Sequence, residues 1–192
     1  MPDRPVTIAN RHPRLRCNRH ALSQVIWILD DAARGFRGGC PPGELSVVFL
    51  TDRALAKLHA DFLDDPSVTD VITFEGDPTL GVAGEICVSA DAALRQVGPR
   101  MAKALGRGKT RRRPRAALPP PSAAQESPAS SSAVPAAFST ELLLYVVHGW
   151  LHLAGFDDLQ PAKKRVMRRA ETKALRLLHR AGLQLDWAQI SL

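Results

Sequence analysis

Two histidines four residues apart, His148 and His152, lie in an apolar segment with a helical pattern. On an α-helix, side chains at positions i and i+4 project from the same face, one turn apart. A first-row metal ion such as zinc binds imidazole nitrogens at about 2.0–2.1 Å, so both rings can reach one ion. The spacing therefore predicts a helix that carries part of a metal site. The alternative from spacing alone is a pair of structural histidines without a metal.

A glycine and two carboxylates follow this pair. Gly155 allows the chain to leave the helix through a left-handed conformation, and Asp158 comes six residues after His152. A loop can therefore return a carboxylate to the same ion. We predict that His148, His152 and Asp158 bind about one Zn²⁺ or similar divalent transition metal per chain, with one position open for water. Asp157 is expected to orient a ligand, and the alternative is that it binds the ion in place of Asp158.

Gly149 follows the first histidine, where the zincin protease motif has a glutamate that acts as general base. The absence of this base disfavours peptide hydrolysis. A bound metal ion would have to activate the attacking water largely by itself, or polarise a phosphoryl oxygen.

Residues 148–158 resemble the signature of the YbeY family of bacterial single-strand endoribonucleases, His-Gly-x-Leu-His-Leu-x-Gly-(Tyr/Phe)-Asp-His. Residues 62–74 are similar to a second family element, which ends in Pro-Thr-Asp-Val-Leu-Ser-Phe, and residues 83–89 are similar to Leu-Gly-Asp-Ile-x-Ile-Ser. Met167 and Glu171 match a Met-x-x-x-Glu pair on the family's last helix.

This resemblance implies a metal-dependent single-strand endoribonuclease of ribosomal RNA maturation and ribosome quality control. Its implied cofactor is zinc, and its implied partners are RNA, chiefly ribosomal RNA, and the small ribosomal subunit. Beyond the metal-bound water, we expect Thr69, Asp70 and Thr73 to shape the wall of the catalytic cleft. The implied fold class is α+β, a single domain with a mixed four-stranded sheet packed with helices.

The chain departs from the family pattern at two functional positions. The family's third metal ligand is a histidine, whereas this chain has Asp158, which is shorter and adds negative charge. The family's cleft arginine is replaced by Leu63. These departures support one alternative, a non-cleaving ribosome-associated RNA-binding factor with a structural metal. Another alternative is a metallohydrolase of a different substrate class, such as peptides, which Gly149 disfavours.

The positive charge of the chain is concentrated in one segment. The formal net charge is +7, and residues 100–115 contain eight Lys and Arg and no acid, so the remainder carries about 7 − 8 = −1. This segment opens a stretch rich in Pro, Ala and Ser. We expect residues 1–192 to form one domain in which residues 97–135 are a disordered insert. Its cations are expected to add salt-dependent RNA affinity, and the alternative is a solvated loop.

Three cysteines, Cys17, Cys40 and Cys87, show neither disulfide spacing nor a Cys-x-x-Cys pair. No apolar run is long enough to span a membrane, and the first residues lack a secretory apolar core. The expected location is the cytoplasm.

Hydrophobic periodicity and turn residues predict an alternation of strands and helices. We expect Asp52 to cap the second helix, the third helix to end at Gly98-Pro99, and Trp150 to pack in the core. The expected strands are residues 6–9, 44–50, 70–74 and 85–89, and the expected helices are residues 19–33, 53–62, 91–97, 138–154 and 161–181.

Overall fold

The computed structural model describes residues 4–106, 133–183 and 187–190, without the side chains of 99–106 and 133–135. Four strands form its main sheet. The strand order is β1 (Val6–Asn10), β3 (Glu44–Leu50), β5 (Val82–Ser89), β4 (Val71–Glu75). Strands β1, β3 and β5 are parallel, and the edge strand β4 is antiparallel to β5. The mixed four-stranded sheet of an α+β domain is thereby confirmed.

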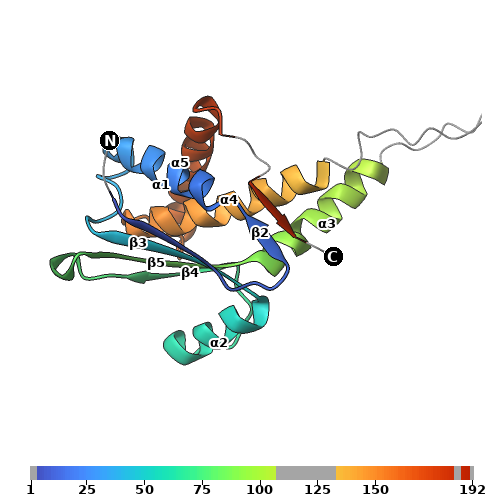
Figure 1. The fold of residues 1–192 in the computed structure, drawn as a ribbon, viewed down its shortest axis with the longest axis horizontal. Helices are drawn as coiled ribbons and strands as arrows, with labels where there is room; N and C mark the ends of the chain where they lie inside the picture. The colour runs from blue at the N-terminus through green and yellow to red at the C-terminus, as the bar shows by residue number, and fades with distance from the viewer. Residues whose placement is uncertain (1–3, 107–132, 184–186, 191–192) are drawn as a thin grey trace, which may run out of the picture.

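Helices cover both faces of this sheet unequally. Helices α1 (Arg19–Asp31), α4 (Ala133–Leu153) and α5 (Pro161–Arg180) lie on one face, whereas α2 (Asp52–Leu63) lies alone on the other (Figure 1). Helix α3 (Ala90–Gly106) leaves the end of β5 and runs alongside α4. Short 3₁₀ helices follow α1 (η1, Ala33–Gly35) and precede β5 (η2, Pro78–Leu80).

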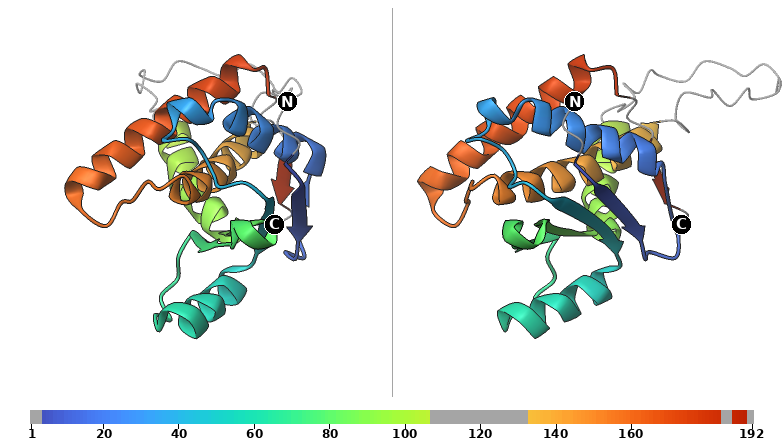
Figure 2. Two further views of the ribbon diagram at one scale, coloured as in Figure 1. Left: turned by 90° about the vertical axis from the view of Figure 1, so that its left-hand side faces the viewer. Right: turned by 60° about the vertical axis from the view of Figure 1, so that its left-hand side comes forward.

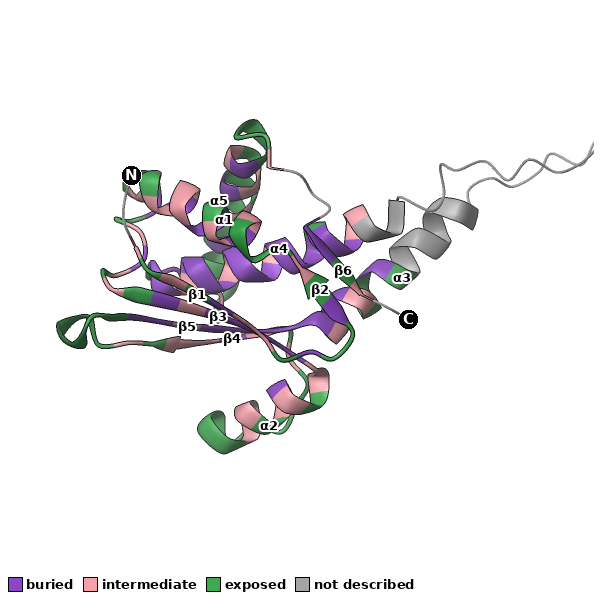
Figure 3. Cartoon of the chain, in the orientation of Figure 1, coloured by how far each residue is buried: buried purple, intermediate pink, exposed green. Residues whose placement is uncertain are grey.

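The main core surrounds α4, which is covered by the sheet on one side and by other helices on another (Figure 3). A helix that is apolar on most of its faces is suited to such a buried place. Trp150 is fully buried, as predicted; its ring contacts Phe36 edge-on, and its Nε1 donates a hydrogen bond to Asp30 Oδ1 at 3.1 Å. A second, smaller cluster under α2 contains Val48, Leu50, Leu55, Ile72 and Cys87.

A second sheet of two short strands was not predicted. Strand β2 (Leu15–Cys17) pairs antiparallel with β6 (Ala188–Ile190), near the end of the chain. The Ser139 hydroxyl of α4 donates to the Ala188 carbonyl oxygen at 2.7 Å, which fixes β6 against the helix that carries the histidines.

The predicted end of the third helix at Gly98-Pro99 is wrong, because α3 continues to Gly106. A proline inside a helix removes one backbone hydrogen bond, but α3 keeps its packing along α4. Helix also extends into both ends of the predicted insert, since α4 begins at Ala133. Residues 107–132 lie outside the described residues, so the disorder and the RNA contact predicted for the insert remain predictions.

The predicted cap of α2 is also wrong. The cap is Thr51, whose Oγ1 accepts a hydrogen bond from the Ala54 amide at 3.3 Å, because the capping side chain must precede the helix to reach this amide. Asp52 lies in the first turn, where it accepts a hydrogen bond from the Ser89 hydroxyl and pairs with Arg95.

In the described parts of the chain, no helix combines the length and apolar character needed to cross a membrane.

Candidate metal centre

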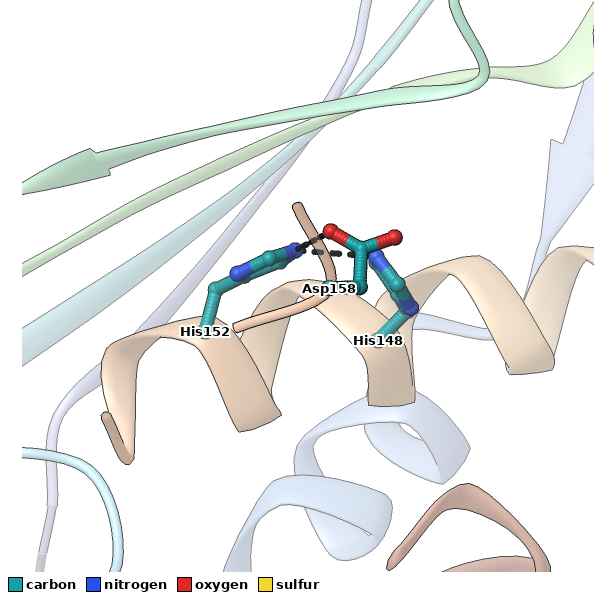
Figure 4. A group of neighbouring side chains, drawn as sticks. All are labelled: His148, His152 and Asp158. Atoms are coloured by element: carbon teal, nitrogen blue, oxygen red, sulfur yellow. Dashed lines mark hydrogen bonds and ion pairs between the residues drawn. The ribbon is translucent and has the colours of Figure 1, made fainter. Parts of the chain in front are cut away.

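The two histidines and Asp158 converge at one point beside α4. His148 and His152 project from the same face of the helix, and Asp158 reaches them from the loop between α4 and α5 (Figure 4). The two Nε2 atoms are 2.9 Å apart, and His152 Nε2 is 3.8 Å from Asp158 Oδ1. One ligand atom from each of the three residues lies within 4.8 Å of the other two. The structure thus brings together the three predicted ligands.

The end of α4 produces this convergence. Gly155 adopts a left-handed conformation with a φ of 78°, which few residues other than glycine adopt easily. The Gly155 amide donates to the His152 carbonyl oxygen, and the Phe156 amide donates to the Leu151 carbonyl oxygen. These bonds close the helix and turn the chain back, so that Asp158 lies over the histidines.

The distances suit a tetrahedral ion. Zinc lies about 2.0–2.1 Å from nitrogen and oxygen ligands, which places tetrahedral ligand atoms about 3.3–3.4 Å from each other. Two separations, 2.9 Å and 3.8 Å, lie on either side of this value, and all three ligand atoms lie within 4.8 Å of one another. The His-His-Asp group could therefore hold a metal ion after small side-chain movements.

The hydrogen bonds on the far side of each ring support the same conclusion. His148 Nδ1 is 2.7 Å from Glu171 Oε1, and His152 Nδ1 is 3.1 Å from the Phe156 carbonyl oxygen. Because a carboxylate and a carbonyl oxygen accept hydrogen bonds, both Nδ1 atoms carry the proton. When both rings are neutral, each presents a lone pair on Nε2. The two Nε2 atoms face each other at 2.9 Å, and either a shared proton or a bound metal cation between them removes the repulsion of their lone pairs.

The electrostatic environment differs between the two rings. Burial lowers the pKa of His148, but the hydrogen bond to Glu171 and nearby carboxylates raise this pKa by more, to above its ordinary value. Burial and the adjacent His148 charge lower the pKa of His152. The pair therefore resists double protonation, while Glu171, Asp158 and Asp70 provide negative charge that favours a bound cation.

Asp157 is directed elsewhere. Its carboxylate accepts hydrogen bonds from the Leu159 amide at 2.8 Å and the Lys163 ammonium group at 2.6 Å, and these bonds lower its pKa. Asp157 thus fixes the loop to the start of α5. Glu171 and the Phe156 carbonyl oxygen make the hydrogen bonds to the histidines, so the orienting role expected of Asp157 stays a prediction.

Two of the three predicted cleft residues lie next to this group. Thr69 and Asp70 line a pocket of about 350 Å³ together with Arg95 and Tyr145. The Asp70 carboxylate of this pocket acts on His148 electrostatically, and Tyr145 precedes that histidine by three residues on α4, so the pocket lies near the histidine. Sequence reasoning did not single out Arg95 or Tyr145, because neither belongs to a local motif.

The third predicted cleft residue, Thr73, has a packing role. A Cβ atom at Gly149 would lie only 2.5 Å from Ile86 Cγ2 and 3.2 Å from Thr73 Oγ1. Gly149 thus lets α4 approach strands β4 and β5 closely. The Thr73 hydroxyl is buried without a hydrogen-bond partner among the described residues. The structure therefore places Thr73 under the metal-site helix.

The family model described as Endoribonuclease YbeY matches residues 7–104 and 123–179 of this chain. The chain belongs to the YbeY family. The match includes all three residues of the candidate site as well as Glu171.

Relatives named Endoribonuclease YbeY show the same relationship. The Rhodopirellula baltica protein is 31% identical over 149 residues, which are 77% of this chain and 58% of that protein. The Chlamydia pneumoniae protein is 33% identical over 142 residues, or 71% of this chain and 70% of that protein. The chain thus spans less than two thirds of the Rhodopirellula relative. A structure solved in solution, from Thermotoga maritima, is 19% identical, covers 90% of this chain and 88% of its own, and has a TM-score of 0.46.

The position of the YbeY-family cleft arginine holds an exposed apolar side chain. Leu63 is the last residue of α2 and is 57% exposed. The neighbouring Phe62 is also exposed and contacts Phe74 edge-on at 5.2 Å between ring centroids. The side chain at this position therefore supplies no positive charge for a phosphate.

Proposed function

We propose that this protein is a metal-dependent single-strand endoribonuclease that acts in ribosomal RNA maturation and ribosome quality control. The main support is the pair of histidine Nε2 lone pairs that converge with Asp158, in a chain whose relatives are named endoribonucleases. The proposed cofactor is Zn²⁺, about one per chain.

In the proposed site, His148 and His152 bind through Nε2, and Asp158 completes a set of three protein ligands. A zinc ion held by these residues would supply a Lewis acid that could polarise a phosphoryl oxygen or activate a water molecule. Glu171 keeps the Nδ1 proton of His148 in place, which leaves its Nε2 free to bind. The Asp158 carboxylate gives the site more negative charge than a third imidazole would.

The pocket beside His148 is the proposed place for the adjoining nucleotide. Thr69 offers a hydroxyl there, and Arg95 offers the positive charge that Leu63 does not. The guanidinium of Arg95 is paired with Asp52, but the Arg95 side chain as a whole is 54% exposed, so it can also face a phosphate.

A second candidate function is a non-cleaving RNA-binding factor with a structural metal. The exposed Leu63 at the arginine position favours it, because phosphate binding there is weakened. A peptidase is disfavoured, because the close packing of Gly149 against Ile86 leaves no room for the glutamate base of zincins.

The proposed partners are ribosomal RNA and the small ribosomal subunit, as the family membership suggests. The proposed compartment is the cytoplasm, supported by the three free cysteines, which suit a reducing environment.

A cleavage assay with metal-depleted and zinc-restored protein tests this proposal. Restored protein should cut single-stranded RNA faster than duplex RNA, and depleted protein should be inactive. His148→Ala should abolish cleavage, whereas the matched control His59→Ala, on α2, should not. Specific RNA binding without cleavage under any metal would instead favour the non-cleaving factor.

A further inference from the structure

A positively charged surface lies on α5, away from the histidines. The cleft between α5 and the α1–η1 segment has a volume of about 790 Å³. Helices α1 and α5 lie side by side in both views of Figure 2. Five basic residues and no acidic residue line this cleft; the basic residues are Arg168, Arg169, Lys173, Arg176 and Arg180.

Most of these cations are exposed and have no acidic partner. Lys163, at the start of α5, is paired with Asp157, but no ion pair forms at the four cleft arginines among the described residues. Lys173 is fixed in the cleft, since its ammonium group donates to the Gly35 carbonyl oxygen and lies 4.8 Å from the centroid of the Phe36 ring. Unpaired guanidinium groups around a concave surface are available to an anionic ligand.

The cleft is separate from the metal centre. Each residue turns an α-helix by about 100°, so Arg169, Arg176 and Arg180 lie about 140–180° around α5 from Glu171. Glu171 faces His148, and the three arginines therefore face away from it. The three arginines lie along twelve residues of α5, from Arg169 to Arg180, or about 16 Å along the helix axis. This row of arginines is longer than a single phosphate group. It therefore suits a polyanion, which carries several phosphates along its length.

We propose that this cleft, lined by Arg168, Arg169, Lys173, Arg176 and Arg180, binds the phosphate backbone of RNA and anchors a part of the substrate that is not cleaved. This inference rests on the proposed endoribonuclease function, because that function makes RNA the polyanion. Guanidinium groups bind phosphate oxygens through two parallel hydrogen bonds. An interfacial membrane helix would need exposed apolar side chains at the cleft, whereas Phe36 is buried.

A binding experiment that does not depend on cleavage tests the cleft. The probe is a 2′-O-methyl RNA, long enough to pass around α5, whose diameter with side chains is about 10–12 Å. Its affinity for full-length protein is measured by fluorescence anisotropy over a range of salt concentrations. The cleft variant is Arg169→Gln/Arg176→Gln/Arg180→Gln. The control, Arg11→Gln/Arg16→Gln/Arg19→Gln, removes three exposed cations elsewhere and changes the net charge equally.

The cleft variant should bind RNA more weakly and flatten the slope of log affinity against log salt by about 2, at about 0.7 per phosphate contact. The control should leave the slope nearly unchanged. A cleft variant with arginines replaced by lysines should retain the slope, because it retains the charge. Equal slopes in the glutamine cleft variant and the control would overturn the proposal. Binding to phosphatidylserine vesicles is measured as well. The proposal would also be overturned if the cleft variant bound RNA normally but no longer bound these vesicles.

RNA cleavage, measured beside the salt slope, distinguishes this proposal from the proposed function. If the protein cleaves no RNA with any metal, the endoribonuclease proposal fails, but a slope change specific to the cleft still shows an RNA contact on α5. If the protein cleaves short RNA and the slopes are equal, only the anchoring proposal fails.

Discussion

His148 Nδ1 lies 2.7 Å from Oε1 of Glu171, and this hydrogen bond joins α4 to α5 behind the candidate metal site. Glu171 thereby fixes the ring orientation of His148 and the nitrogen that carries its proton. The bond connects residues that are 23 positions apart in the chain. The position of α5 and the geometry of the site are therefore coupled.

Replacing Glu171 by glutamine should weaken metal binding. The amide retains a hydrogen-bond acceptor but loses the negative charge that makes His148 a better ligand. We expect zinc affinity to fall by about 10–100-fold, the usual effect of losing such a supporting partner. Competition with a chromogenic chelator measures this affinity. Glu75→Gln, at an exposed glutamate on β4, is the matched control. Equal affinities in Glu171→Gln and wild type would contradict this role.

The two adjacent aspartates should differ in their effect on the metal. Asp158→Ala should reduce zinc affinity more than Asp157→Ala, because only Asp158 is directed at the histidines. Asp158→His should tighten binding by restoring the imidazole ligand of the family. The same chelator competition measures all three variants. A larger loss in Asp157→Ala than in Asp158→Ala would show that the loop places the other carboxylate on the ion.

A methyl group at Gly149 should destabilise the fold. Alanine favours a helix over glycine by about 1 kcal/mol. The new Cβ would, however, lie 2.5 Å from buried Ile86 Cγ2, and such overpacking costs about 1–3 kcal/mol. We expect Gly149→Ala to lower the free energy of unfolding in urea. If the variant is more stable than wild type, helix propensity dominates and α4 packs less tightly on β5 than the structure shows.

The indole hydrogen bond between Trp150 and Asp30 should contribute to stability. Trp150→Phe removes the bond to a buried carboxylate, and a hydrogen bond to a charged group contributes about 1.5–3 kcal/mol. Trp27→Phe is the control, because its indole donates to the uncharged Arg4 carbonyl oxygen. Urea unfolding should show a larger loss for Trp150→Phe. Equal losses would mean that the Asp30 charge adds nothing to the bond.

Local patterns in the sequence were sufficient to predict which three side chains converge at the candidate site. One helix end contains both the i, i+4 spacing of His148 and His152 and the turn at Gly155. These features can therefore be predicted from neighbouring residues in the sequence. The orienting role of Glu171 was not predicted. It depends on how α5 packs against α4, and only the family's Met-x-x-x-Glu pair pointed to that residue.

The missed features of the fold depend on tertiary contacts. Strands β2 and β6 have three residues each and lie near opposite ends of the chain, so no periodicity could reveal their pairing. Helix α3 continues through Pro99 and contacts α4, whereas local propensity favours a helix end at Gly98-Pro99. In α2, both Thr51 and Asp52 suit a capping position, and only the backbone geometry distinguishes them.

Elemental analysis of the purified protein tests the central claim most directly. We predict about one divalent transition metal per chain in wild type and in His59→Ala, and loss of the metal in His152→Ala. Adding zinc to depleted wild type should raise the melting temperature, because an ion that binds only the folded state stabilises it. Metal retained in His152→Ala, or wild type without metal and without a thermal shift on adding zinc, would contradict a metal site at His148, His152 and Asp158.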